Sequence, residues 1–159
     1  MASVFDVAAH ILRRMAEREP QGVTTWKLQK LVYYAQAWNL VWDDKPLFNE
    51  HIEAWANGPV CPALYDWHRG NFKIQRLGVG DPGRLDKDEL ETIDAVVEHY
   101  GVRTPQYLSN LTHAEMPWAR AREGLAPGER GNHVIHLDSM AEYYGGLYNE
   151  DVEAPNQKN

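Results

Sequence analysis

The spacing of apolar residues along the chain predicts a protein built mostly of helices. In the first helical segment the apolar positions recur three or four residues apart, which places them on one face of a helix. These positions are Val4, Val7, Ala8, Ile11, Leu12 and Met15. Ser3 precedes them as a suitable N-cap and Pro20-Gln21-Gly22 follows, so we expect the helix to lie between these signals.

The second helical segment has the broadest apolar surface in the chain. Thr24 or Thr25 is its expected N-cap. Its apolar residues at three- or four-residue spacing are Leu28, Leu31, Val32, Ala35, Trp38 and Trp42. Tyr33, Tyr34 and Ala37 widen this stripe, so we expect the helix to be buried on much of its circumference.

Capping residues mark two further helices. Asp86 and Glu89 form a capping-box pattern ahead of a helix that Gly101 closes. Thr104 is the expected N-cap of the next helix, with Pro105 at its first position.

Prolines and glycines set the remaining boundaries. A short helix is expected after Pro62, and Pro117 should break a helix near residues 112–116. The last helix is expected to end at Gly145-Gly146.

A very small β element is predicted near residues 52–76. The side chains of residues 52–55 alternate in character, which indicates a short strand, and a second strand is expected at Phe72–Gln75. We expect the two to pair in a small hairpin or sheet. The predicted fold is therefore mainly α, a single compact helical domain with this β element added.

An aromatic corner with two prolines follows the first strand. Gly58 is expected to supply a backbone conformation, or a close approach, that a Cβ would prevent. Pro59 and Pro62 should hold the exit rigid because they fix φ. The residues expected to pack this corner against the second helix are Trp55, Val60 and Tyr65.

Length and composition fit one domain with one core. The chain has 159 residues, 43% of them hydrophobic, with six tryptophans and eight tyrosines that could serve as partner anchors. The domain is predicted to span residues 1–148, and the polar, acidic segment 149–159 is predicted to be a disordered tail. The net charge of −7 argues against non-specific binding to DNA, RNA or anionic lipid and favours a basic partner.

The single cysteine, Cys61, excludes an intrachain disulfide and a cysteine-based zinc site. Its apolar, proline-flanked setting predicts a raised thiol pKa and an unreactive side chain. The N-terminus does not resemble a signal peptide, and no apolar run is long enough to span a membrane. A cytoplasmic location without a membrane partner is the default expectation.

Catalytic and metal-binding patterns are weak. His113 and Glu115 could act as a general acid and base in a small hydrolase, but Thr112 and Glu115 also match a capping box, which we favour. His133 and His136 are three residues apart, a spacing that occurs by chance. We therefore expect no catalytic residues, no metal site and no cofactor.

A few basic residues near the start raise the alternative of a DNA-binding regulator whose second helix reads the groove. On an acidic chain such residues are more often part of solvated faces, and the helix is apolar on too many sides for this role. The residues concerned are Arg13, Arg14, Lys27 and Lys30.

Three sequence blocks, taken in order, resemble the Panacea domain of Soc-type antitoxins from toxin–antitoxin systems. The blocks are "KLQKLVYYAQAW" (27–38), "EAWANGPVCPALY" (53–65) and "LSNLTHAEMPWARAR" (108–122). The resemblance extends roughly from Val4 to Tyr144. The matching positions are Leu28, Lys30, Leu31, Tyr34, Glu53, Ala54, Trp55, Gly58, Pro59, Val60, Pro62, Tyr65, Thr112, His113, Pro117 and Trp118.

The resemblance implies a non-enzymatic antitoxin, mostly helical, that binds a cognate toxin protein and neutralises it. Some family members hand the toxin to a protease, and some occur in phage and prophage. Others carry an additional N-terminal DNA-binding region; this chain begins directly with the domain, so direct DNA binding is not expected.

The aromatic corner is also the expected partner-binding platform, because rigid anchors lose little entropy on docking. The residues assigned to it are Glu53, Trp55, Tyr65, Trp67, His68, His113 and Trp118.

Overall fold

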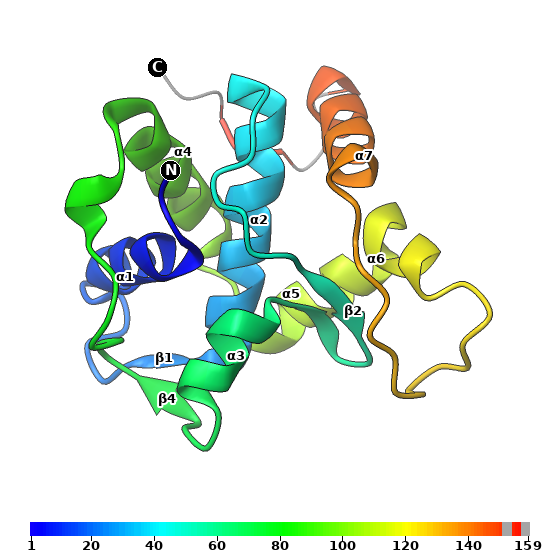
Figure 1. Cartoon of the computed structure of the whole chain (residues 1–159), viewed down its shortest axis with the longest axis horizontal. Coiled ribbons are helices and arrows are strands. Elements are labelled where there is room, and N and C mark those ends of the chain that lie inside the picture. The colour runs from blue at the N-terminus through cyan, green and yellow to red at the C-terminus, as the bar shows by residue number, and fades with distance from the viewer. Residues whose placement is uncertain (151–153, 157–159) are drawn as a thin grey trace.

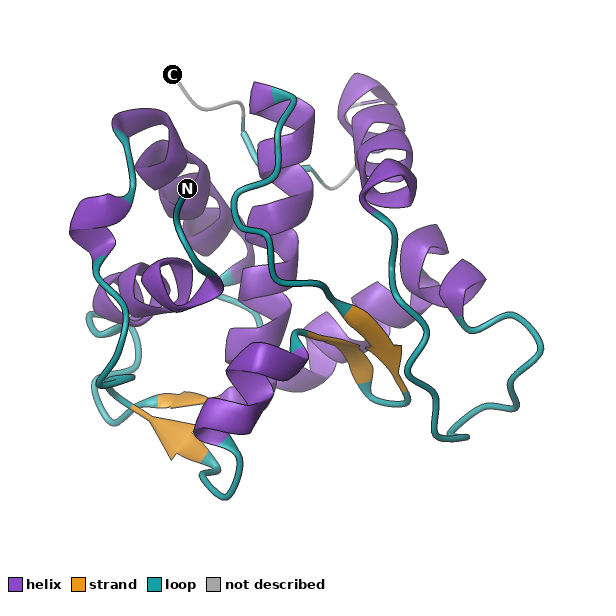
Figure 2. Cartoon of the chain, in the orientation of Figure 1, coloured by secondary structure: helices purple, strands orange, loops and turns teal. Residues whose placement is uncertain are grey.

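A computed structural model describes residues 1–150 and 154–156 and confirms a mainly helical fold with very little β-structure (Figures 1 and 2). The helices are α1 (Val4–Met15), α2 (Thr25–Asp43), α3 (Pro62–His68), α4 (Lys87–Tyr100), α5 (Pro105–Ala114), α6 (Met116–Ala121) and α7 (Leu137–Glu150), with a 3-10 turn at Pro82–Arg84. The strands are β1 (Val23–Thr24), β2 (Glu53–Trp55), β3 (Gly58–Val60) and β4 (Lys73–Ile74).

Helix α2 runs through the centre of the molecule, with α1 and α4 on one side and α7 on the other (Figure 1). The predicted burial of its apolar stripe is confirmed, since Leu28, Leu31, Val32, Ala35 and Trp38 have no exposed surface. A helix that is buried along most of its length has little surface to place in a DNA groove. The structure therefore gives no support to the alternative in which this helix reads DNA.

Local capping signals predicted most helix starts correctly. Ser3 accepts a hydrogen bond from the backbone of Asp6, and the Asp6 side chain completes a capping box. Asp86 and Glu89 form the second predicted box, while Thr24 and Thr104 cap α2 and α5. These bonds satisfy backbone N–H groups that the first turn of a helix leaves without partners. The predicted break before Pro117 is confirmed as well, because α5 ends at Ala114 and α6 begins at Met116.

The expected strand pairing is wrong. Residues 53–55 pair with residues 58–60 in a tight antiparallel hairpin, with Ala54 opposite Pro59. The strand near residue 73 pairs instead with Val23 and Thr24. Gly58, at φ +134°, turns the chain back at once, so the nearer partner is available before any distant one. The two residues of β1 are too few to give an alternation signal.

The predicted end of the last helix is also wrong, because α7 continues through both glycines to Glu150. Glycine in a helix costs about 0.5–1 kcal/mol relative to alanine. Beyond the glycines, Leu147 and Tyr148 pack against the core, and the Tyr148 ring meets the Trp38 ring edge-on. This burial offsets the cost of the glycines. Helix α7 thus extends two residues into the segment predicted as a tail; residues 151–153 and 157–159 of that segment lie outside the described residues.

None of the helices in the described part of the chain combines the length and apolar character that a bilayer-spanning segment requires.

Candidate partner-binding pocket

The turn of the β2–β3 hairpin is seated directly on helix α2. Gly58 has a positive φ of +134°, and a Cβ added there would lie 3.1 Å from Cε and 3.2 Å from Nζ of Lys30. Both expectations for this glycine are confirmed. Just after the hairpin, the Gln29 side chain accepts a hydrogen bond from the Cys61 backbone at 2.9 Å. Pro62 then begins α3, so hairpin, α2 and α3 are held together at one corner.

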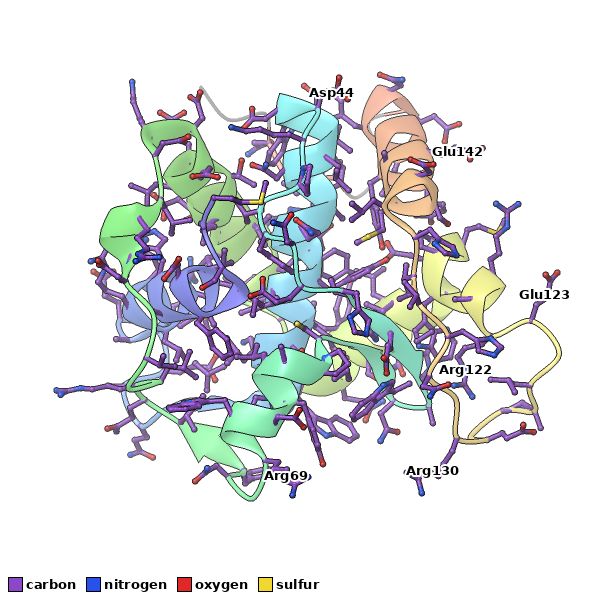
Figure 3. The ribbon with its side chains drawn as sticks, in the orientation of Figure 1. Asp44, Arg69, Arg122, Glu123, Arg130 and Glu142 are labelled. Carbon is purple, nitrogen blue, oxygen red and sulfur yellow. The ribbon has the colours of Figure 1, made fainter. Side chains whose placement is uncertain are left out.

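This corner forms one wall of a cavity of about 840 Å³. The other walls are the first turns of α2, helix α3 with the loop after it, and a loop between α6 and α7. Figure 3 labels Arg69 and Arg130, which come from the last two of these and lie at the lower edge of the view. The lining residues are Thr25, Trp26, Gln29, Lys30, Glu53, Trp55, Ala56, Asn57, Val60, Tyr65, His68, Arg69, Gly70, Asn71, Phe72, Arg130, Gly131 and Asn132.

Four of the seven residues predicted to bind a partner line this cavity: Glu53, Trp55, Tyr65 and His68. The rings of Trp55 and Tyr65 meet edge-on with centroids 4.9 Å apart. Glu53 accepts the indole N–H of Trp55 at 2.8 Å and also contacts His51 at 2.7 Å. Trp55, Val60 and Tyr65, the residues expected to pack the corner against α2, are half-buried and line the cavity. None of the three belongs to the fully buried core.

Two of the predicted residues support the hairpin from behind. His113 and Trp118 stack in parallel with centroids 4.0 Å apart, and Trp118 Nε1 donates to the Trp55 carbonyl at 2.9 Å. Burial lowers the pKa of His113, and its Nε2 has no hydrogen-bond partner among the described residues. Beneath them Arg122, which sequence reasoning missed, donates to the Ala54 carbonyl at 3.0 Å and lies over the Trp118 ring.

The seventh predicted residue, Trp67, lies apart from the cavity. Its indole N–H donates to the Leu77 carbonyl at 2.7 Å, and its ring packs edge-on against Phe5. The structure therefore does not place Trp67 with the other predicted residues.

Lys30 is buried, which contradicts the expectation of a solvated face. Only 2% of the residue is exposed, and Nζ lies 5.1 Å from the centroid of the Trp26 ring. Across residues 1–150 and 154–156, Nζ has no hydrogen-bond or ion-pair partner. Burial without a counter-charge lowers the pKa of Lys30 to about 8.

The neighbouring Lys27 is buried too, but its charge is paired. Its Nζ donates to Glu19 and to the Gly101 carbonyl, each at 2.7 Å. The spacing of Lys27, Lys30 and Tyr34 places all three on one face of α2, and this spacing was the available sign that the lysines lie inside. Arg13 and Arg14, in contrast, are exposed, as expected.

His68 is held as a neutral acceptor at the inner end of the cavity. The Gln29 amide donates to His68 Nε2 at 2.9 Å, and burial lowers the pKa of the imidazole. Gln29 also bonds to the Cys61 backbone, and burial raises the pKa of the Cys61 thiol to about 11, as the sequence predicted.

Glu115 occupies the N-cap position of α6, but its side chain makes no capping hydrogen bond, so the expected capping box is wrong. Its carboxylate is buried and accepts hydrogen bonds from the hydroxyls of Tyr34 at 2.7 Å and Tyr144 at 2.8 Å. Tyr33 joins through a 3.0 Å bond to Tyr144. Thr112, the other half of the expected box, donates to the Ser109 carbonyl. Glu115 is thus directed at tyrosines while the His113 ring is stacked on Trp118, an arrangement that supports the fold and leaves the hydrolase alternative without geometric support.

In the described part of the chain, no group of three or more His, Cys, Asp or Glu side chains is arranged to hold a metal ion. His133, one of the two histidines considered for a metal, contacts the Ala121 carbonyl through Nδ1.

Two comparisons with known proteins both match SocA-like antitoxins. Residues 28–119, more than half of the chain, match the family described as "Antitoxin SocA-like, Panacea domain". The chain is also 33% identical over 110 residues to "Antitoxin SocA" of Caulobacter vibrioides (strain NA1000 / CB15N). This alignment covers 60% of the chain and 58% of the relative, so the chain matches less than two thirds of that protein's length. No solved structure matches the chain.

Proposed function

Because this chain belongs to the family of SocA-like antitoxins with a Panacea domain, we propose that it is an antitoxin that binds a cognate toxin protein and holds it inactive. The family match is the observation that supports this role most directly. Neutralisation proceeds by binding alone, and the chain itself makes or breaks no covalent bond.

The toxin docks on the surface around the cavity. Two large apolar side chains at its rim are exposed, Trp26 at 46% and Phe72 at 75%. Trp55 and Tyr65 add half-buried aromatic surface just inside. Aromatic side chains on rigid elements are typical energetic anchors of protein interfaces, because little side-chain entropy is lost when they are covered.

The test is co-expression with the toxic product of the adjacent gene. We expect this chain to restore growth and to co-purify with that product. A neighbour that is harmless by itself, or whose toxicity is unaffected by this chain, would overturn the proposal.

The docking surface is tested by the double variant Trp26→Ser with Phe72→Ser, which should weaken co-purification. Val102→Ser is a control, because Val102 is also an exposed apolar residue, at 57%, but does not line the cavity. Equal binding by both variants would place the interface elsewhere. The toxin's half-life in cells with and without this chain tests whether the antitoxin also delivers the toxin to a protease.

A further inference from the structure

The Lys30 side chain is buried, and its ammonium group has no counter-charge among the described residues. It points into the cavity, with the Trp26 ring on one side and the Gly58 backbone on another. A buried ammonium without a counter-charge is strongly unfavourable, and natural proteins pair such groups or keep them for a ligand. The paired state of Lys27, one helical turn away, shows that this fold is able to neutralise a buried lysine.

The cavity is locally positive although the whole chain is acidic. Lys30, Arg69 and Arg130 line it, against the single carboxylate of Glu53. Both oxygens of that carboxylate are occupied, one by the Trp55 indole and one by His51. A group that enters the cavity therefore meets three cations and one engaged anion, on a protein whose net charge is −7. This charge distribution favours an anionic occupant.

We propose that the toxin inserts an aspartate or glutamate side chain into this cavity and that Lys30 binds its carboxylate. The inference rests on the proposed antitoxin function and names the chemistry by which the same surface recognises its partner. A carboxylate supplies the missing counter-charge, and its removal from water is compensated by a charge-assisted hydrogen bond.

The size and rim of the cavity favour a carboxylate presented by a protein over a free ion. About 840 Å³ is far more than one carboxylate fills, so residues flanking it would occupy the remainder. Trp26 and Phe72 at the rim offer apolar surface that a polypeptide covers and a small inorganic anion does not.

The first experiment compares the two buried lysines in binding to the product of the adjacent gene. Lys30→Met should weaken toxin affinity about 30-fold or more, because the inserted carboxylate loses its charge partner. Lys27→Met is the matched control, from the same helix and equally buried, and should keep the affinity within about threefold. If Lys27→Met does not fold, Lys27→Arg takes its place.

The second experiment locates the carboxylate. Each acidic residue of the toxin is changed to its amide, and affinity is measured for wild type and Lys30→Met. One acidic position should show a strong effect with wild type and almost none with Lys30→Met. If wild type binds the toxin but no position is coupled to Lys30, the inference fails and the antitoxin function stands. If wild type does not bind, both fail.

The third experiment uses pH and a free anion. Binding of a carboxylate requires charged Lys30, whose pKa in the free protein is about 8, so toxin affinity should fall between pH 7.5 and 9.5 in wild type and stay constant in Lys30→Met. The pKa values of His68 and His113 are lowered, so neither titrates in this window. The ionisable side chains that line the cavity with Lys30 are Glu53, Tyr65, His68, Arg69 and Arg130, and His113 interacts electrostatically with Lys30.

Inorganic phosphate at 20 mM serves as the probe for a free anion. It should neither shift the Lys30 resonances in NMR spectra nor compete with the toxin. Competition by phosphate that is lost in Lys30→Met, together with an unchanged toxin affinity of that variant, would reassign the cavity to a small anion and overturn the proposal.

Discussion

Two regions next to helix α2 contain buried polar side chains, and they differ in whether those side chains have hydrogen-bond or charge partners. In the tyrosine–glutamate cluster, formed by Tyr33, Tyr34, Glu115 and Tyr144, the polar side chains bond to one another inside the core. At the cavity, Lys30 has the same degree of burial but no partner among the described residues. A closed network stabilises the fold by itself, whereas an open one is stabilised by what binds to it.

The largest expected effect comes from opening the closed cluster. In Glu115→Ala the hydroxyls of Tyr34 and Tyr144 lose their buried acceptor, and each unsatisfied buried group costs about 1–3 kcal/mol. We expect the free energy of unfolding, measured in urea, to fall by about 3 kcal/mol. Glu115→Gln keeps an acceptor oxygen and should lose clearly less. Equal losses in the two variants would show that the acceptor is not what stabilises this cluster.

The second largest loss of stability is expected from adding a side chain at the hairpin turn, next to Lys30. Gly58→Ala forces an L-residue to φ +134° and places its Cβ against Lys30, so we expect a loss of about 2 kcal/mol in unfolding free energy. Gly78→Ala is the control, since Gly78 also has positive φ but nothing lies within 4 Å of an added Cβ. Gly58→Ala should lose more unfolding free energy than Gly78→Ala, and this difference should become smaller when Lys30 is changed to Met. If the difference stays the same, contact with Lys30 is not its cause.

The pH dependence of the unfolding free energy tests whether Lys30 is unpaired in the folded protein. The folded pKa of Lys30 lies below the unfolded value, so between about pH 8 and 10.5 the unfolded chain binds more protons and stability rises with pH. Lys30→Met removes this group. The stability of wild type relative to the variant should therefore increase by about 2 kcal/mol between pH 7 and 9.5. Parallel stability curves would show that Lys30 is already paired in solution.

The smallest effect is expected from a single hydroxyl of the closed cluster. Tyr144→Phe should cost about 1 kcal/mol, because Glu115 keeps its bond from Tyr34 and only the Tyr33 hydroxyl loses its partner. Burial raises the pKa of Tyr144, so the wild-type hydroxyl contributes stability below pH 10 that is lost as the unfolded chain deprotonates above it. The difference in unfolding free energy between wild type and variant should therefore narrow above pH 10. A constant difference would show that this hydroxyl ionises alike in both states.

The features that the sequence predicted correctly depend on interactions between residues close together in the chain. The caps at Ser3, Thr24 and Asp86 and the apolar stripe of α2 depend on residues three or four positions apart, so their signals are contained in short segments. The antitoxin family was also identified correctly, because its three blocks are themselves short and ordered.

The predictions that were wrong depend on partners distant in sequence. Thr112 and Glu115 have the spacing of a capping box, but Tyr34 is 81 residues away from Glu115 and no local pattern reveals that contact. Strand pairing and the burial of Lys30 are likewise decided by which elements meet in space. Four predicted binding residues share a cavity because the hairpin and α3 adjoin in sequence, whereas Arg69, Phe72 and Arg130 enter it from loops.

The loop between α6 and α7 has a practical consequence for protein engineering. Its start is fixed by α6 and its end by the hydrogen bond from Ala54 to the His133 carbonyl. Between these two anchored points, Arg130, Gly131 and Asn132 line the cavity. A randomised library confined to this segment would change the shape of the proposed docking surface and leave the helical scaffold as it is. If the toxin docks there as proposed, selection of such a library against foreign toxins should yield variants with new specificities.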